Sequence, residues 1–343
     1  MNRRFRLLIS LVGILSAGFC VNPSLAVAAS QAKMKIGLVL STLQEERYQK
    51  DLKYFTDEAH KLGFEPIVVS ADNNPQTQSA KVENLLSQGV KALVIQPVNS
   101  EAAANLVKMA HDDMVPVVAY DRLISNSPVD FYVTMDSFKV GTLQAEAAVK
   151  ATHEKGNYVL LMGQAGHSVA NEITRGVESV LKKYPNIKIV MKKNHEGWSS
   201  SLAMATVENA LTQNKNNIQA VLANNSGMAR GAVQALGEQG LAGKVFVAGA
   251  DADLAAIKDI VAGKQQFEVL KDIAPLAQTA AQVAFQLAKG EKPKSSENVS
   301  SGGFQIPTMA TPVYGITKEN LEERIYKTGF HSKASVLGST NGK

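Results

Sequence analysis

Several short apolar runs in this chain end abruptly in charged or amide side chains. The clearest is VPVVAY, which is followed at once by Asp121 and Arg122. Four further runs, FYVTM, AVLA, VFVAGA and FEVL, lead in the same way to Asp136, to Asn224 and Asn225, to Asp251, and to Lys271 and Asp272. Such groups hydrogen-bond polar ligands, and bonds with a charged partner are about twice as strong as neutral ones. We expect these side chains to form one shared binding site.

An apolar run that ends in polar residues is typical of a parallel strand that leads into a binding crevice. In open α/β sheets, ligands lie outside the carboxyl ends of the strands. From residue 35 onwards such runs alternate with longer helical stretches, which is the pattern of βαβ units. The predicted strands are KIGLVLS, EPIVVSA, ALVIQPV, VPVVAYDR and FYVTMD, then NYVLLMG, IKIVMKKN, AVLANN, KVFVAGAD and FEVLKD.

The alternation of strands and helices begins again after FYVTMD, so the second half of the chain repeats the plan of the first. Gly63 and Gly89 stand where a left-handed residue closes a helix, and Asn74 with Pro75 opens one. A chain of 343 residues is too long for one small domain. We therefore predict the α/β class, with two doubly wound parallel-sheet lobes. The Gly-, Ser- and Pro-rich stretch 290–312 is predicted to be a surface crossing.

The first 28 residues have the pattern of a secretory signal peptide. Three arginines precede an apolar run from Leu7 to Val21, and the small residues of SLAVAAS follow. Cleavage after Ala28 would release a mature chain that begins near Ala29, and the alternative is a membrane anchor. The one cysteine, Cys20, lies inside this segment, where it could also be a lipid attachment site. The mature chain is thus expected to have no thiol for disulfides, catalysis or metal binding.

The charge of the mature chain is close to neutral. The formal net charge of +5 includes the three arginines of the signal segment, so the remainder carries about +2. A nucleic-acid-binding domain would have a pronounced basic surface, and none is indicated. An exported, thiol-free, nearly neutral chain is expected in a bacterial periplasm.

The sequence contains no pattern of an enzyme site. GxSxG, HExxH, P-loop and GxGxxG motifs are absent, and the six histidines are scattered without metal-ligand spacing. A glycosidase with Asp121 and Asp251 as its acid and base is the alternative. The neighbouring Arg122 and Lys271 would, however, keep both carboxyl groups ionised. We expect no enzyme activity, no cofactor and no metal.

Longer motifs indicate a family. ERYQKD at 46–51, AYDRLI at 119–124 and DADLAAIK at 251–258 occur in one chain with Trp198 in HEGW and Lys271 in VLKD. In this order and spacing the chain resembles the periplasmic sugar-binding proteins of ABC importers, and most closely their xylose-binding branch. The resemblance covers nearly the whole mature chain.

The resemblance implies a two-lobed clamp, the type I periplasmic binding protein fold, with a three-stranded hinge. The chain would cross between the lobes near Asp136, near Lys271 and within 307–312. The amino-terminal lobe would comprise residues 29–135 and 272–308. The carboxyl-terminal lobe would comprise 136–271 and 309–329, and residues 330–343 would form a loose tail.

The resemblance also implies the residues that bind the sugar. Ionised planar side chains suit a ring of hydroxyl groups, and an aromatic ring suits the C–H face of a sugar. The implied ligand-binding residues are Arg47, Glu46, Tyr48, Asp121, Arg122, Asp136, Asn171, Trp198, Asn225, Asp251 and Lys271.

Several of these residues have a second interpretation. Glu46 could only orient Arg47, and Asp136 could simply cap the helix that follows it. Trp198 could pack in the core, and Lys271 could face solvent from its strand.

The chain departs from the xylose-binding pattern at three places. Ser137 stands where the pattern has asparagine, Ser226 where it has aspartate, and residues 168–171 replace a run richer in acid and amide. A polar group left unpaired in a closed site costs about 1–3 kcal/mol. Either the ligand differs or other residues compensate, and His167 and Asn171 are the candidates for compensation.

The expected function is the capture of a xylose-like pentose or hexose by closure of two lobes. The expected partners are the sugar and the membrane subunits of an ABC importer, with no nucleic acid. The alternative is a sensor subunit that presents the sugar to a chemoreceptor or histidine kinase. A sugar-responsive transcription regulator would need a DNA-binding headpiece where this chain has the signal segment. We expect a monomer.

Overall fold

The computed structural model describes residues 33–338. The predicted signal peptide, including Cys20, and residues 339–343 lie outside this range. No helix within residues 33–338 is long and apolar enough to cross a membrane.

The first sheet has seven strands in the order β11-β12-β5-β4-β3-β1-β2. All neighbours are parallel except the hairpin pair β11 and β12. Because β2 lies on one side of β1 and β3 on the other, the strand order reverses next to β1, which is where ligands bind in such sheets. The strands are β1 (Lys35–Leu40), β2 (Glu65–Ser70), β3 (Leu93–Ile95), β4 (Val117–Tyr120), β5 (Phe131–Met135), β11 (Glu297–Ser301) and β12 (Phe304–Thr311).

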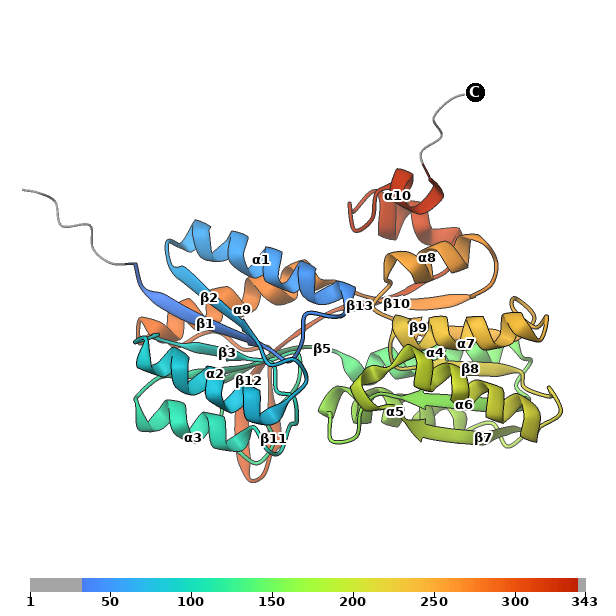
Figure 1. Ribbon diagram of the computed structural model, residues 1–343, viewed down its shortest axis with the longest axis horizontal. Coiled ribbons are helices and arrows are strands. Elements are labelled where there is room, and N and C mark those ends of the chain that lie inside the picture. Colours follow the sequence, from blue (N-terminus) through green and yellow to red (C-terminus); the bar gives the residue numbers. More distant parts are fainter. Residues whose placement is uncertain (1–32, 339–343) are drawn as a thin grey trace, which may run out of the picture. The chain divides into compact units, whose positions relative to one another are not determined.

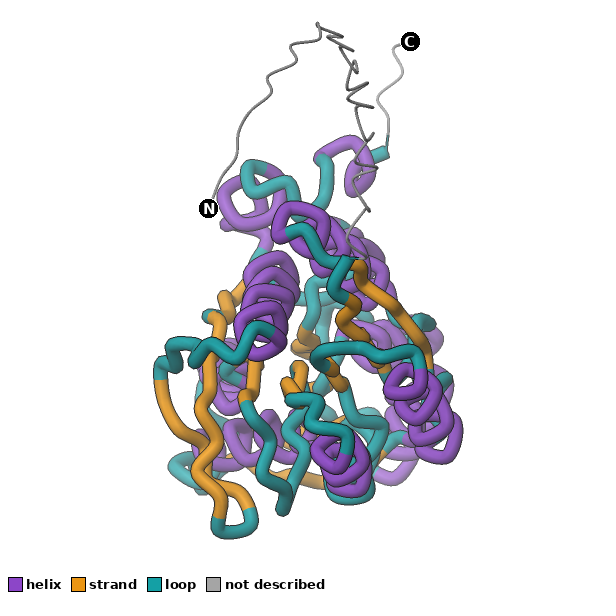
Figure 2. Tube along the Cα trace, turned by 90° about the vertical axis from the view of Figure 1, so that its left-hand side faces the viewer, coloured by secondary structure: helices purple, strands orange, loops and turns teal. Residues whose placement is uncertain are grey.

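Helices cover both faces of this sheet (Figure 1). On one face α1 (Glu46–Leu62) and α9 (Ile273–Ala288) pack against the strands, and α2 (Pro75–Ser87) and α3 (Ala104–Asp112) cover the other. Although α1 and α9 are far apart in sequence, Gln282 Nε2 donates to Glu58 Oε1 at 2.7 Å. The tube in Figure 2 follows the same helices around the strands. Helix α9 therefore packs with the first sheet.

The second sheet has six strands in the order β13-β10-β9-β8-β6-β7. Its first five strands in the chain repeat the order of the first sheet, and only β13 is antiparallel to its neighbour. This confirms the predicted fold class and the repeated plan. The strands are β6 (Gly156–Met162), β7 (Ile187–Asn194), β8 (Ala220–Ala223), β9 (Phe246–Ala250), β10 (Phe267–Lys271) and β13 (Val313–Ile316); the helices are α4 (Ser137–Ala151), α5 (Ser168–Leu181), α6 (Ser200–Gln213), α7 (Ser226–Glu238) and α8 (Leu254–Val261).

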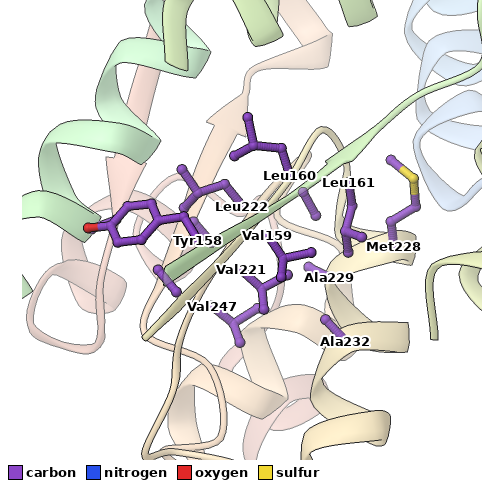
Figure 3. Packing of buried hydrophobic residues seen from close by; sticks show 14 of the residues in the cluster. Tyr158, Val159, Leu160, Leu161, Val221, Leu222, Met228, Ala229, Ala232 and Val247 are labelled. Carbon is purple, nitrogen blue, oxygen red and sulfur yellow. The ribbon is translucent and has the colours of Figure 1, made fainter. Parts of the chain in front are cut away.

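The core of the second lobe lies between these strands and helices. Figure 3 shows side chains of β6, β8 and β9 packed against Met228, Ala229 and Ala232 of α7. Leu161 and Val221 are fully buried, as a parallel strand covered on both faces requires.

Local signals end and begin the helices as predicted. Gly63 has φ 86° and its N–H donates to the carbonyl of Ala59 at 2.9 Å, which closes α1. The Asn74 side chain accepts the N–H of Thr77 at 2.8 Å, and Pro75 takes the first helical position of α2.

The chain passes from one sheet to the other at three points. These lie between β5 and α4, between β10 and α9, and between β12 and β13. Residues 290–312 were predicted to be a surface crossing, but most of this stretch forms the hairpin of β11 and β12, visible at the bottom of Figure 1. The sequence did not indicate these strands, because β11 is an edge strand whose side chains are mostly polar and exposed.

The prediction of a loose tail is wrong for residues 330–338. The tail contains α10 (Lys333–Leu337), and Val336 packs with Ile257 and Ile325 in a small apolar cluster. His331 is buried, and its Nε2 donates to the carbonyl of Ala252 at 2.8 Å. The tail therefore supports the loop that follows β9.

Candidate ligand-binding site

The carboxyl ends of strands from both sheets meet around one cavity. Its wall is predominantly polar and mostly buried. The lining residues are Glu45, Arg47, Tyr48, Asp121, Arg122, Val169, Trp198, Asn225, Asp251 and Lys271.

Arg47 projects from the first turn of α1 and is held by two carboxylates. Its Nε and Nη2 donate to the two oxygens of Asp51 at 3.3 and 3.2 Å, and its Nη1 donates to Asp121 Oδ1 at 3.2 Å. Tyr120 also donates to Asp51. The guanidinium group is thus fixed before any ligand arrives, which lowers the entropy cost of binding.

Asp121 follows β4 with a left-handed backbone, at φ 61°. The neighbouring strand β5 stabilises this conformation, because the hydroxyl groups of Tyr132 and Thr134 donate to the Asp121 carbonyl at 3.0 and 3.1 Å. Burial raises the pKa of the Asp121 side chain, but nearby cations, chiefly Arg47 and Arg122, outweigh burial and hold the pKa below its ordinary value. The cavity therefore contains an ionised carboxylate.

Arg122 lies beside Tyr48 in the cavity wall. Its Nη2 donates to the Tyr48 hydroxyl at 2.9 Å and its Nη1 to the Pro97 carbonyl at 3.2 Å. The Arg122 guanidinium carbon lies 5.8 Å from the centre of the Trp198 ring. Arg122 of the first lobe therefore lies beside the Trp198 ring of the second lobe.

Gln96, which the sequence analysis did not single out, orients Asp121 from behind. Its Nε2 donates to Asp121 Oδ2 at 2.9 Å, and its Oε1 accepts from the hydroxyl of Ser41 at 2.8 Å. Gln96 follows β3 and Ser41 follows β1, at the point where the strand order reverses. The sequence could have indicated Gln96, because it directly follows the apolar run ALVI, as Asp121 follows its own strand.

The second lobe contributes Asn225, Asp251 and Lys271. The Asn225 side chain caps α7 by accepting the N–H of Met228 at 2.8 Å. Lys271 Nζ lies 2.8 Å from Asp251 Oδ1 and forms an ion pair with it. The contact lacks the alignment of a hydrogen bond, and this buried oxygen has no hydrogen-bond donor among residues 33–338. The second lobe thus places one positive and one negative charge side by side in the cavity wall.

Trp198 lies against the end of β6 because a glycine leaves room for it. A Cβ on Gly163 would come within 2.4 Å of the indole ring. The indole Nε1 donates to His167 Nδ1 at 2.8 Å, and His167 Nε2 donates to the carbonyl of Val98 in the first lobe. Both ring nitrogens of His167 are thus occupied, and burial, reinforced by Arg122, lowers its pKa to about 3.

Three of the predicted ligand-binding residues lie outside the cavity lining. Glu46 Oε2 accepts the N–H of Leu254 from the second lobe at 3.0 Å. Asp136 is exposed and caps α4 through the N–H of Lys139 at 2.8 Å, which was the second interpretation. Asn171 is exposed on α5.

His167 and Asn171, the candidates for compensation, do not line the cavity. His167 bonds to Trp198 and to the first lobe. Val169 does line it, so this segment presents an apolar side chain there.

Glu45 is a cavity residue that the sequence analysis missed. It precedes α1 without capping it, and it is half-buried. Burial, with a smaller contribution from Asp251, raises the pKa of Glu45 to about 7. The family motif ERYQKD begins at the adjacent Glu46, so Glu46 was predicted to bind the ligand in place of Glu45.

No group of three His, Cys, Asp or Glu side chains within residues 33–338 could hold a metal ion. The arrangement instead suits hydrogen bonding to a small polyhydroxylated molecule, because it combines charged donors, charged acceptors and one aromatic face.

Comparisons with known proteins identify the family. A family model described as a periplasmic binding protein domain matches residues 36–292. The chain is 41% identical to the D-xylose-binding periplasmic protein of Escherichia coli (strain K12), over 90% of this chain and 94% of that protein. It is 39% identical to the D-xylose-binding periplasmic protein of Haemophilus influenzae, over 96% of this chain and 98% of that protein.

Solved structures are similar as well. A solute-binding protein of an ABC transporter from Clostridium phytofermentans with bound β-D-glucose has a TM-score of 0.81 at 25% identity, over 88% of this chain and 99% of that chain. Another from Bacillus halodurans C-125 with bound myo-inositol has a TM-score of 0.77 at 29% identity, over 86% of this chain and 98% of that chain.

Proposed function

This chain belongs to the periplasmic binding protein family, and from that premise we propose that it binds one monosaccharide, D-xylose or a related pentose or hexose, for an ABC importer. The cavity carries the proposal, since both lobes present charged and aromatic side chains to one small space. The two relatives compared above are named for D-xylose and the periplasm. The fold neighbours contain β-D-glucose and myo-inositol, which are ring polyols of similar size.

Each side chain of the cavity has a distinct part in the proposed recognition. Asp121 and Asp251 accept hydrogen bonds from sugar hydroxyl groups, and Arg122 and Lys271 donate to sugar oxygens. Trp198 covers an apolar C–H face of the ring. The proposed ligand-binding residues are Glu45, Arg47, Tyr48, Asp121, Arg122, Trp198, Asn225, Asp251 and Lys271.

Glu46, Asp136 and Asn171 are left out of this set. Glu46 is assigned instead to the contact between the lobes, because it accepts a backbone N–H from the second lobe.

We propose that sugar binding closes the two lobes over the ligand. The lobes already touch through short polar contacts, including Leu123 N–H to Ser168 Oγ at 2.9 Å and Leu254 N–H to Glu46 Oε2 at 3.0 Å. A sugar that bonds both walls at once adds free energy only to the closed state, and so it shifts the population towards that state. The membrane subunits of the importer would then recognise the closed form.

Within residues 33–338, no feature favours a sensor subunit over a transport protein. The proposed function is therefore transport. We further propose that the mature chain acts in the periplasm as a monomer, which light scattering after size exclusion would test.

Calorimetry tests the proposed ligand. The mature chain, residues 29–343, is titrated with D-xylose and with a panel of other pentoses and hexoses. We expect one site with saturable heat for at least one of these sugars. Heat from none of them would refute the proposal.

Substitution of Asp121 by alanine tests the proposed site. The change removes an ionised acceptor and leaves Arg47 and Arg122 short of a partner. Detectable binding should disappear while the circular dichroism spectrum still shows a folded protein, with a lower melting temperature. Wild-type affinity in this variant would remove Asp121 from the site.

A further inference from the structure

Glu268 is a fully buried carboxyl group in the second lobe, behind the cavity wall and not part of its lining. It lies on β10, beside Gly249 of the neighbouring strand β9. A Cβ on Gly249 would come within 2.1 Å of Glu268 Oε1, so the fold leaves space for this side chain. A buried carboxyl group is costly unless it forms several hydrogen bonds.

The carboxyl group of Glu268 is fully engaged. Its Oε2 lies 2.9 Å from the hydroxyl oxygen of Ser226 and accepts the N–H of Ala252 at 3.1 Å. Its Oε1 accepts from Gln265 Nε2 at 2.6 Å. One side chain thus joins the start of α7, which follows the loop after β8, to the loop after β9, and it also contacts Gln265 just before β10.

Each of these loops carries a cavity residue. Ser226 directly follows Asn225, and Ala252 directly follows Asp251. Asp251 and Ala252 are consecutive residues with positive φ, at 102° and 57°. Such backbone costs about 1–3 kcal/mol per residue and persists only where the surroundings hold it. The bond from Ala252 N–H to Glu268 is one such restraint.

The hydrogen-bond geometry also indicates the protonation state of Glu268. Ser226 Oγ accepts the N–H of Asp253 at 3.2 Å and lies 2.9 Å both from the Ala250 carbonyl and from Glu268 Oε2. A hydroxyl group has one proton, and an ionised Glu268 would compete with Ala250 for it. A proton on Oε2 that donates to Ser226 leaves the Ser226 proton for Ala250, and every group is then paired.

The electrostatic surroundings agree with a protonated Glu268. Burial, with a smaller contribution from the negative charge of Asp251, raises its pKa to about 8, although the hydrogen bonds oppose this. Its hydrogen-bond partners Ser226, Gln265 and Ala252 are uncharged groups.

We propose that Glu268 is a positioning residue of the sugar site, which as a neutral acid holds the loops of Asn225 and Asp251 against each other. This inference rests on the proposed function.

The test compares two variants of the mature chain, Glu268→Gln and Glu268→Leu, by calorimetry with D-xylose. The first keeps a neutral side chain that can form hydrogen bonds, and the second keeps the volume and removes the bonds. We expect Glu268→Gln to bind within about threefold of the wild type and Glu268→Leu to bind about tenfold or more weakly, a loss of about 1.4 kcal/mol or more.

Amide hydrogen exchange of the ligand-free protein provides a readout that does not involve sugar. The Ala252 amide should exchange slowly in the wild type and in Glu268→Gln, and faster in Glu268→Leu. The control is Tyr158→Phe, which removes a buried hydroxyl bonded to Thr152 at 2.7 Å near the other end of the sheet. This control should lower the melting temperature and leave the affinity unchanged, so it separates positioning from general loss of stability.

Wild-type affinity and slow Ala252 exchange in Glu268→Leu would overturn the inference while leaving the proposed function intact. A wild type that binds no sugar would instead refute the proposed function, and with it the sugar role of Glu268. If Glu268→Leu does not fold, Glu268→Gln decides: retained affinity supports the neutral acid, and a loss above tenfold in a folded protein contradicts it.

Discussion

At the scale of single residues, the site is built on strained backbone. Asp121, Trp198 and Asp251 line the cavity, and all three have positive φ, at 61°, 56° and 102°. Each such residue costs about 1–3 kcal/mol of stability. The surrounding strands sustain the strain through bonds such as that from the Asp121 N–H to the Val133 carbonyl at 2.8 Å. The left-handed backbone is found at three residues whose side chains line the cavity.

The Gly163→Ala substitution tests the placement of Trp198. The added Cβ would lie 2.4 Å from the indole ring, so the ring must move. We expect D-xylose affinity to fall by about tenfold or more, with a shifted tryptophan emission maximum. Gly237→Ala is the matched control, because it also lies in α7 and a Cβ added there would meet no atom within 4 Å. An unchanged affinity in Gly163→Ala would show that the ring position is unimportant for binding.

Asp121, Arg122, Asn225 and Asp251 were predictable from the sequence because they stand just after apolar strands. Arg47, Tyr48 and Trp198 were predicted only from the family resemblance. Glu45 was missed because the family motif begins at its neighbour Glu46, and only the helix geometry decides which of two adjacent acids faces the cavity. Asp136 was assigned to the ligand from the same pattern, and a helix cap produces that pattern equally well. The burial of Glu268 could not be predicted, since one charged residue in a strand is usually exposed.

At the scale of elements, the start of α5 connects the two lobes. His167 precedes this helix, and its ring joins Trp198 to the Val98 carbonyl of the first lobe. Burial lowers the pKa of His167 from its ordinary value to about 3, so the folded protein keeps the ring neutral. An unfolded chain takes up a proton near pH 6.5.

This pKa shift predicts a specific dependence of stability on pH. The contribution of His167 is complete above about pH 6.5 and is lost progressively as the pH falls towards 3, because the unfolded state then binds one more proton. His167→Gln, which cannot titrate, should lose less stability than the wild type between pH 7 and pH 4. Urea unfolding at several pH values measures the difference. Parallel stability curves for the two proteins would contradict a neutral, buried His167.

The helices and central strands were predictable from periodicity and from cap residues such as Gly63 and Asn74. The hairpin of β11 and β12 was not, because its edge strand carries exposed polar side chains and no apolar alternation. The same holds for α10, a five-residue helix anchored mainly by Val336. Long-range contacts stabilise these elements, and local sequence does not encode them.

At the scale of the whole molecule, the proposal is one sugar that bonds both lobes. Asp121 and Arg122 come from the first lobe, and Trp198, Asp251 and Lys271 come from the second. The sugar therefore stabilises only the conformation in which both walls are close. The closed conformation then indicates that a sugar is bound. An importer that recognises the closed shape would respond to sugar and not to the empty protein.

The most direct test of this account is the intrinsic fluorescence of the mature chain during titration with D-xylose, because Trp198 is the one tryptophan of the sequence. The account predicts a saturable change with one-site stoichiometry, which disappears in Asp121→Ala although residue 121 lies in the opposite lobe. A response only to another monosaccharide would identify that sugar as the ligand and would leave the proposed closure of the lobes unchanged. Silence of Trp198 with every pentose and hexose would contradict the account.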